Sequence, residues 1–303
     1  MLTNHQPGHE RLAYVRRRLG KPAYECGDVL LYVGDAVELM ARMPDGSVDL
    51  TVTSPPYNIG KEYERALPMS EYIEWSRSWL SGIPRITASG GAFWLNLGYA
   101  PVAGEGKAVP LPYLLWDKVD MFLIQEIVWN YGAGVAARNS FSPRNEKWLW
   151  YVNDPAAYTF NLDAVRDPDV KYPNQRKHGR LRVNPAGKNP SDVWAIPKVT
   201  TGEGGDGRRA AAERTSHPAQ FPEAVITRIV RACSDPGDIL LDPFGGSGTT
   251  GAVALATDRA CVLFEIRADY AQIAARRLNA IKRSLEEIQS ELVGFDVMPH
   301  PQT

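Results

Sequence analysis

The chain has 303 residues, of which 44% are hydrophobic and 23% charged, values that exclude a disordered, collagenous or membrane-embedded class. Its formal net charge of -1 argues mildly against a nucleic-acid binder, which usually carries a basic excess. The three cysteines (Cys26, Cys233 and Cys261) are isolated, so the sequence predicts no metal site and no disulfides, but a reducing, cytoplasmic setting.

Short apolar runs bounded by turn residues alternate with helical patterns along the chain. This alternation predicts an α/β domain with a mostly parallel sheet. The predicted strands are 28–33, 48–53, 91–97, 122–129, 147–152, 238–242 and 260–265. The predicted helices are 36–43, 70–87, 222–233, 249–257 and 268–291, with Ser70 as the cap of the second.

The loop Ser54-Pro55-Pro56-Tyr57 directly follows the predicted strand 48–53, at a strand end where α/β sheets bind ligands. Its prolines remove two N–H donors and keep the backbone extended, so the loop displays carbonyl oxygens, a hydroxyl and an aromatic ring. These groups suit a flat base with an exocyclic amino group. Ser54 Oγ and the Pro55 carbonyl can accept its protons, and Tyr57 can stack on it. A plain proline turn is the alternative.

The stretch 166–214 carries eleven Lys or Arg against six Asp or Glu, so the rest of the chain is acidic. A solvated loop and a phosphate-contacting insert both fit this composition. A second polar stretch, with Arg138, Asn139, Arg144 and Asn145, fits a surface loop as well as one that faces such a partner. The candidate residues for contacting a polyanion such as DNA are Lys171, Arg176, Lys177, Arg180, Arg182, Asn184 and Lys188.

Residues 238–251, DILLDPFGGSGTTG, predict a strand, a glycine turn and the start of a helix. Glycines allow close backbone approach, and a helix N-terminus offers free N–H groups. Glu265 follows Gly246 by nineteen positions, where a carboxylate can accept hydrogen bonds from ribose hydroxyls. We therefore expect a nucleoside-containing ligand, either a dinucleotide or S-adenosylmethionine. Only one helix follows Glu265, so N-terminal strands must complete the sheet, and this permuted order favours S-adenosylmethionine.

The segments TSPPY (53–57) and DPFGGSGTT (242–250) together resemble the signature of the S-adenosylmethionine-dependent DNA amino-methyltransferases. The catalytic loop comes first and the cofactor loop last, as in the permuted β group of that family. The resemblance implies a Rossmann-like, circularly permuted, mixed seven-stranded sheet with helices on both faces. The implied organisation is an N-terminal extension (1–27), a catalytic half (28–153), a target-recognition region (154–214), a cofactor-binding half (215–292) and a C-terminal tail (293–303).

The resemblance also implies roles for individual residues. Ser54, Pro55, Pro56 and Tyr57 would form the catalytic loop. In the cofactor site, Glu265 would bind the ribose, Asp35 the adenine amino group, and His217 would border the methionine end. The full implied cofactor-binding set is Asp35, His217, Asp242, Phe244, Gly245, Gly246, Gly248 and Glu265.

The implied reaction is direct methyl transfer from S-adenosyl-L-methionine to the exocyclic amino nitrogen of a base flipped out of duplex DNA. Family members with Ser before Pro-Pro-Tyr often modify cytosine N4, so that target is favoured, and adenine N6 remains the alternative. A dinucleotide-dependent oxidoreductase and a non-catalytic DNA-binding protein are more distant alternatives. A cognate restriction endonuclease and a homodimer are the partners that such a family suggests besides double-stranded DNA.

Overall fold

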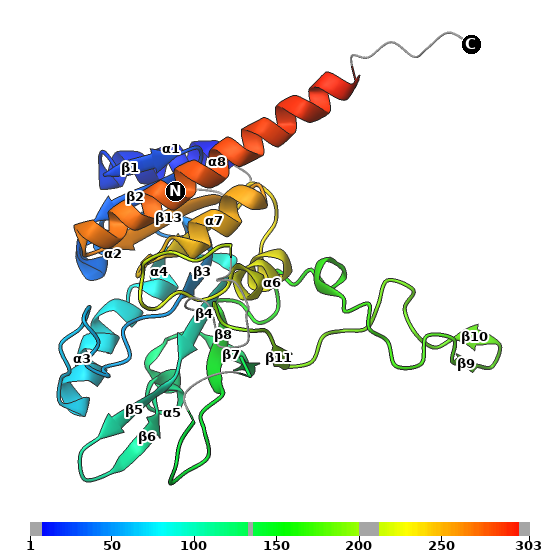
Figure 1. Cartoon of the computed structure of the whole chain (residues 1–303). Helices are drawn as coiled ribbons and strands as arrows, with labels where there is room; N and C mark the ends of the chain where they lie inside the picture. The colour runs from blue at the N-terminus through cyan, green and yellow to red at the C-terminus, as the bar shows by residue number, and fades with distance from the viewer. Residues whose placement is uncertain (1–7, 133–135, 200–211, 297–303) are drawn as a thin grey trace.

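The computed structural model describes residues 8–132, 136–199 and 212–296. In this part of the chain, nine strands form one sheet in the order β1-β2-β13-β12-β3-β4-β8-β7-β11, and helices cover both of its faces (Figure 1). The strands are β1 (Tyr24–Cys26), β2 (Val29–Val33), β3 (Val48–Thr53), β4 (Thr87–Leu97), β7 (Phe122–Asn130), β8 (Asn145–Val152), β11 (Val193–Ala195), β12 (Ile239–Asp242) and β13 (Ala260–Glu265).

The sheet order confirms the predicted permutation. The last two strands of the chain, β12 and β13, lie in the middle of the sheet between β2 and β3, and all four are parallel. The strand β8 runs antiparallel between β4 and β7, which makes the sheet mixed as expected. The seven predicted strands are all present, and the short edge strands β1 and β11, which we did not predict, extend the sheet to nine.

Two apolar cores lie on opposite faces of the sheet, because successive side chains of a strand point to opposite faces. Leu30 of β2 belongs to the first core and its neighbour Leu31 to the second. The first core takes side chains from α1 (Gly8–Leu19), α2 (Ala36–Arg42), α3 (Met69–Leu80), α4 (Ile83–Ile86) and α5 (Leu111–Leu115). The second takes them from α6 (Glu223–Cys233), α7 (Thr249–Ala256) and α8 (Ala268–Asp296).

The single helix predicted over 70–87 is wrong, because the structure divides it into α3 and α4. Pro84 lies in the first turn of α4, where its missing N–H does no harm, whereas inside a continuous helix it would remove a hydrogen bond. Ser70 is not the cap of α3 either: that position belongs to Pro68, which makes no side-chain capping bond.

Two further elements lie in segments for which the sequence predicts no helix or strand. The extension 1–27 contains α1, whose Leu12, Val15 and Leu19 are buried in the first core. The region 154–214 contains β11, which pairs with β7 and so belongs to the main sheet. Both elements were missed because a short amphipathic helix and a three-residue strand carry little periodic signal.

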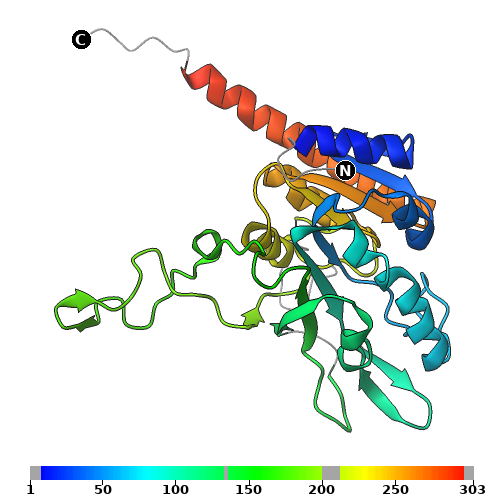
Figure 2. The same cartoon turned by 180° about the vertical axis from the view of Figure 1, so that it is seen from behind.

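Residues 166–192 of the basic stretch form an arm that reaches away from the sheet, as both views show (Figures 1 and 2). Near its tip, β9 (Arg176–Lys177) and β10 (Arg180–Leu181) form a small antiparallel hairpin. At its base, Asp167 and Lys188 form a β-bridge and an ion pair with a nitrogen–oxygen distance of 3.2 Å. A second hairpin, β5 (Tyr99–Val102) with β6 (Gly106–Pro110), follows the carboxyl end of β4.

Candidate active site

The glycine turn between β12 and α7 has the shape that its sequence predicts. Gly246 and Gly248 adopt φ angles of +49° and +75°, a left-handed conformation that glycine adopts without strain. A β-carbon on Gly246 would lie 3.1 Å from the imidazole of His217, and one on Gly248 would lie 2.9 Å from Ala274 Cβ. The turn can therefore pack this closely against His217 and Ala274 only because these positions lack side chains.

Asp242 is fully buried at the start of this turn, and both of its carboxylate oxygens accept hydrogen bonds from the protein itself. Oδ1 accepts from Thr53 Oγ1 at 2.7 Å and from the Phe244 amide at 3.1 Å, while Oδ2 accepts from Thr250 Oγ1 at 2.8 Å. Burial raises the pKa of Asp242 to about 6, although these bonds favour the charged form. Its geometry is therefore that of a residue that shapes the turn.

Glu265 and Asp35 lie at the ends of neighbouring parallel strands, β13 and β2. Glu265 accepts from the Gly246 amide through Oε2 and from the Arg267 amide through Oε1, each at 2.9 Å. Each oxygen keeps a second lone pair for a ligand hydroxyl. Asp35 caps α2 through Oδ1, which accepts from the Val37 amide at 2.9 Å. The structure thus brings both predicted carboxylates to one edge of the sheet, beside the glycine turn.

Aromatic groups border the turn on two sides. Phe244 packs against Trp79 and Trp75, with ring centroids 5.1 and 5.8 Å away. His217 lies edge-on to Tyr270 at 4.4 Å, and burial lowers its pKa to about 4, so it is neutral at pH 7. Its Nδ1 accepts from the Ala219 amide at 3.2 Å, which leaves the proton on Nε2, facing Gly246.

These groups together fit an adenosyl ligand. Two carboxylates, which can accept from hydroxyl and amino groups, lie beside a turn whose glycines let its backbone pack closely against His217 and Ala274. The residues predicted to bind the cofactor thus lie together at one edge of the sheet, and Asp242 holds the shape of the turn.

The Ser-Pro-Pro-Tyr loop is held rigidly at the end of β3. Tyr72 Oη donates to the Pro56 carbonyl at 2.8 Å, whereas the Pro55 carbonyl has no hydrogen-bond partner among the described residues. Asn58 takes a φ angle of +61°, and Glu64 accepts from its backbone amide at 2.7 Å. Pro55 is a buried residue, and its carbonyl is thus left without a partner within the described part of the chain.

The hydroxyl of Tyr57 points into the protein and lies at the centre of a polar cluster. Its oxygen is 3.0 Å from Ser54 Oγ, 2.8 Å from Asn96 Oδ1 and 3.0 Å from Glu146 Oε2. Sequence reasoning missed Asn96 and Glu146. Both lie at the ends of predicted strands, but only the pairing of β4 with β8 reveals that these ends meet beside the loop.

One hydrogen bond joins the two motifs directly. Thr53, the residue before Ser54, donates to Asp242 in the glycine turn at 2.7 Å, across 189 positions of sequence. Because β3 and β12 are adjacent and parallel, both loops leave the same edge of the sheet. The catalytic loop and the cofactor turn are therefore side by side.

The predicted DNA-binding residues gather on the arm, and all of them are exposed. Lys188 differs from the rest because it pairs with Asp167 at the base of the arm, so it braces the arm. Arg138, Asn139 and Phe141 lie in the connection between β7 and β8, which leaves the sheet at the same edge as the catalytic loop. Phe141 is fully exposed, at 101%, and was missed in the sequence.

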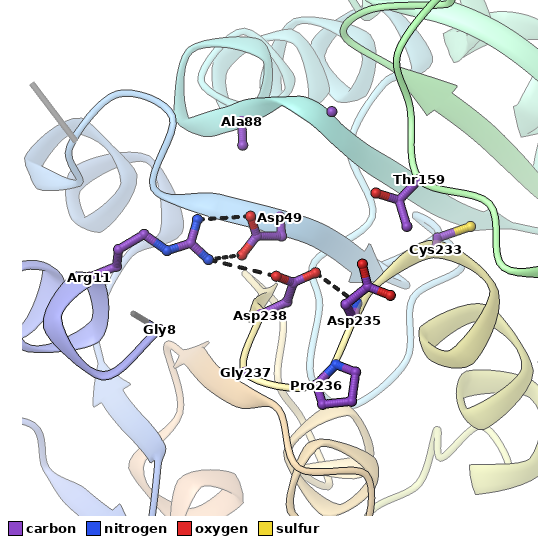
Figure 3. Close-up of a pocket in the computed structure, with 11 residues that line it drawn as sticks. Gly8, Arg11, Asp49, Ala88, Thr159, Cys233, Asp235, Pro236, Gly237 and Asp238 are labelled. Atoms are coloured by element: carbon purple, nitrogen blue, oxygen red, sulfur yellow. Dashed lines mark hydrogen bonds and ion pairs between the residues drawn. The ribbon is translucent and has the colours of Figure 1, made fainter. Parts of the chain in front are cut away.

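A cavity of about 390 Å³ opens at the opposite edge of the sheet, near the amino ends of β3 and β12. Figure 3 shows Arg11 of α1 reaching between Asp49 and Asp238 there. Arg11 Nη1 donates to Asp49 Oδ1 at 2.9 Å, and burial, with the nearby charge of Asp49, raises the pKa of Asp238 to about 6. This edge is remote from both motifs, so the ion pairs serve to dock α1.

Residues 8–132, 136–199 and 212–296 contain no group of three or more His, Cys, Asp or Glu side chains placed to hold a metal ion. Among the helices of these residues, none is both long and apolar enough to cross a membrane.

Comparison with known proteins agrees with this geometry. Residues 48–276 match the model of the N6_N4_Mtase family, described as DNA methylase. The chain is 61% identical to the Type II methyltransferase M.ScaI of Streptomyces caespitosus, over 91% of this chain and 89% of that protein. It is 34% identical to the DNA adenine methyltransferase YhdJ of Escherichia coli, over 84% of each.

Solved structures share the fold. The PvuII DNA methyltransferase, described as cytosine-N4-specific, aligns with a TM-score of 0.66 at 20% identity, over 88% of this chain and 95% of that one. A Thermus thermophilus DNA modification methylase in complex with S-adenosyl-L-methionine aligns with a TM-score of 0.56 at 22% identity, over 83% and 95%. The family match contradicts the oxidoreductase alternative and confirms the expected cofactor, S-adenosyl-L-methionine. The chain belongs to the N6/N4 family of DNA methyltransferases.

Proposed function

We propose that this enzyme methylates the exocyclic N4 of cytosine in a specific sequence of duplex DNA. The observation that carries the proposal is the 2.7 Å hydrogen bond from Thr53 to Asp242, which keeps the Ser-Pro-Pro-Tyr loop beside the glycine turn. An amino group bound at the loop then lies close to a cofactor bound at the turn. Holding two reactants in this way removes much of the entropic barrier to their reaction.

In the proposed mechanism, S-adenosyl-L-methionine, when bound, supplies a methyl group on its sulfonium sulfur. Glu265 and Asp35 would hold its adenosyl part, and His217, which is neutral, would border it without repelling the positive sulfur. Ser54 Oγ and the Pro55 carbonyl accept hydrogen bonds from the target amine, which draws its lone pair out of the ring and toward the methyl carbon. Tyr57 presents its ring to the base while its hydroxyl is anchored behind the loop.

The arm is the proposed DNA-recognition element. Its exposed Arg and Lys side chains provide the counterion release that drives binding to a polyanion, while the acidic body avoids nonspecific attraction. Flipping the target base leaves a gap in the stack, and exposed Phe141 is the candidate to fill it, since apolar wedges commonly enter base steps. By analogy with the Type II relative, a companion endonuclease that cuts the same sequence is part of the proposal.

Adenine N6 is the second candidate target. The 34% identity with an adenine methyltransferase favours it, and so does the carboxylate of Glu146, which is linked to Ser54 through the Tyr57 hydroxyl and adds acceptor strength that the serine alone lacks. Cytosine is preferred because the loop begins with Ser, as family members that modify cytosine N4 often do.

Nucleoside mass spectrometry after incubation with duplex DNA and S-adenosyl-L-methionine tests the proposal. The expected product is N4-methylcytosine, absent from a parallel reaction with Ser54→Ala. N6-methyladenine would refute the target base alone. If neither methylated nucleoside formed on DNA of varied sequence, the catalytic proposal would be refuted, and a DNA-binding protein without activity would be favoured.

A further inference from the structure

The Tyr57 hydroxyl carries one hydrogen but has three oxygen neighbours: Ser54 Oγ, Asn96 Oδ1 and Glu146 Oε2, at 3.0, 2.8 and 3.0 Å. The orientation of Asn96 is fixed because its Nδ2 donates to the Lys147 carbonyl at 3.1 Å, so its oxygen can only accept from Tyr57. An ionised Glu146 can also only accept. Two acceptors thus share the single proton of Tyr57, and the phenol oxygen is left to accept from Ser54.

This arrangement sets the direction of the Ser54 hydroxyl. When Glu146 is ionised, Ser54 donates its hydrogen to Tyr57, and the lone pairs of Ser54 Oγ face the space in front of the loop. If Glu146 were protonated, it would donate to the Tyr57 oxygen and could no longer take up the Tyr57 hydrogen. Ionised Glu146 is therefore the state in which a proton can pass from Ser54 through Tyr57 to a carboxylate.

We propose that Glu146 is the terminal proton acceptor of the methylation reaction, reached from the target amine through Ser54 and Tyr57. The inference rests on the proposed role of Ser54 in binding that amine. Glu146 does not touch the base in this scheme. It is a positioning residue that orients two hydroxyls and stores the proton that the reaction releases.

The transfer balances. The amino nitrogen forms a bond to the methyl carbon while the bond from that carbon to sulfur breaks, and the sulfur keeps the electron pair. The nitrogen, now positively charged, passes one proton to Ser54 Oγ. Ser54 passes its own proton to Tyr57 Oη, and Tyr57 passes its proton to Glu146 Oε2. Glu146 ends neutral and returns the proton to water along the same chain after the methylated base leaves.

The surroundings of Glu146 suit this role. Burial raises the pKa of Glu146 above its ordinary value, while Tyr57, Asn96 and the positive charge of Lys198 favour the ionised form. Buried Tyr57 has a pKa well above that of free tyrosine, so it relays a proton without becoming an anion for long. The other titratable groups that face Glu146 are Tyr63, Tyr99 and Tyr131.

The relay also accounts for a weakness of the catalytic loop. A neutral serine is a poor proton acceptor, and this loop has no carboxylate of its own. The structure places the Glu146 carboxylate behind Ser54, with the Tyr57 hydroxyl between them. Glu146 lies on β8, 89 positions after Tyr57 in the sequence. A Ser-Pro-Pro-Tyr loop can then accept a proton as a loop with its own carboxylate would, whether the target base is cytosine or adenine.

The test compares Glu146→Gln and Tyr57→Phe with a control, Glu126→Gln, which removes a carboxylate from the adjacent strand β7 without touching the cluster. Gln keeps the size of Glu but cannot take up a proton, and Phe keeps the ring of Tyr57 but breaks the chain. Single-turnover methylation is measured against pH, and calorimetry with S-adenosyl-L-methionine checks the fold of each variant.

For the unaltered enzyme, the rate should rise with pH through a group whose pKa lies above that of free glutamate, because the relay needs ionised Glu146. Both cluster variants should lose about 100-fold in rate and this pH dependence, with cofactor affinity unchanged. The double variant should be no slower than either single one, since both break one chain. The control should keep the rate and the profile.

A Glu146→Gln variant that binds cofactor and keeps either the methylation rate or the rise of that rate with pH would overturn the relay. A Tyr57→Phe variant with an unchanged methylation rate and pH dependence would do so independently, even if Glu146→Gln failed to fold. These outcomes are separate from the proposed target base, because an unaltered enzyme that produces N6-methyladenine would still allow the relay to be measured.

Discussion

Two buried threonines of β3 offer a matched test of the bond that joins the motifs. Thr53 and Thr51 are both fully buried. Thr53 Oγ1 donates to Asp242 at 2.7 Å, whereas Thr51 Oγ1 has no hydrogen-bond partner among the described residues. Replacement by Val keeps the shape of either side chain and suits a strand, so Thr53→Val and Thr51→Val differ only in the bond that is lost.

The expected effects have opposite signs. A hydrogen bond to a charged group contributes about 1.5–3 kcal/mol, so Thr53→Val should lower the free energy of unfolding by about 2 kcal/mol. Thr51→Val removes a buried hydroxyl that lacks a partner, so it should raise that free energy by about 1 kcal/mol. Urea denaturation at about pH 8, where Asp242 is ionised, measures both.

The defect of Thr53→Val should also depend on pH. The folded-state pKa of Asp242, about 6, lies above its ordinary value of 3.8. Its contribution to stability is therefore fully present below about pH 4 and is lost as the pH rises through 6. Without the Thr53 bond this pKa rises further, so the defect should shrink to about 1 kcal/mol at about pH 5, where the carboxyl is neutral. Equal losses in the two variants, or a defect of Thr53→Val that does not vary with pH, would refute the reasoning.

Four further changes test the site. Ser54→Ala should slow methylation about 100-fold with unchanged calorimetric affinity for S-adenosyl-L-methionine; an active variant would contradict its role. The double variant Arg176→Ala, Arg180→Ala should reduce the slope of log binding constant against log salt concentration by about two, as measured by fluorescence anisotropy with DNA. An unchanged slope would show that the arm does not contact DNA phosphates. Gly248→Ala places a β-carbon on a residue with a φ of +75°, so it should lower the free energy of unfolding by about 2 kcal/mol; unchanged stability would contradict this reasoning. Phe141→Ala should weaken DNA binding about tenfold without altering thermal stability, and equal affinity would exclude a wedge.

The sequence predicted the local features well, because each depends on neighbouring residues. The strands 48–53 and 260–265 have the predicted bounds, since short runs rich in apolar and β-branched residues between turns are typical of strands. The two motifs follow their strands as expected, and their order along the chain predicted the permuted sheet. The break between α3 and α4 was the exception, although Pro84 was the signal that could have revealed it.

Only the tertiary structure decided which distant polar groups meet. Nothing within the segment around Glu146 relates it to Tyr57, and their contact arises from the pairing of β8 with β4. Likewise, Asp242 has the sequence position of a ligand-binding residue, but burial and the hydroxyls of Thr53 and Thr250 make it the brace of the turn.

The charge of the chain shows the same division. The sequence by itself determined that a near-neutral total hides a basic segment in an acidic chain, because composition needs no folding to be read. The fold decided that the basic side chains stand on an exposed arm while Lys188 and Arg11 form ion pairs that hold parts of the protein together. A charge acts through its distance from other charges and from water, and only packing sets those distances.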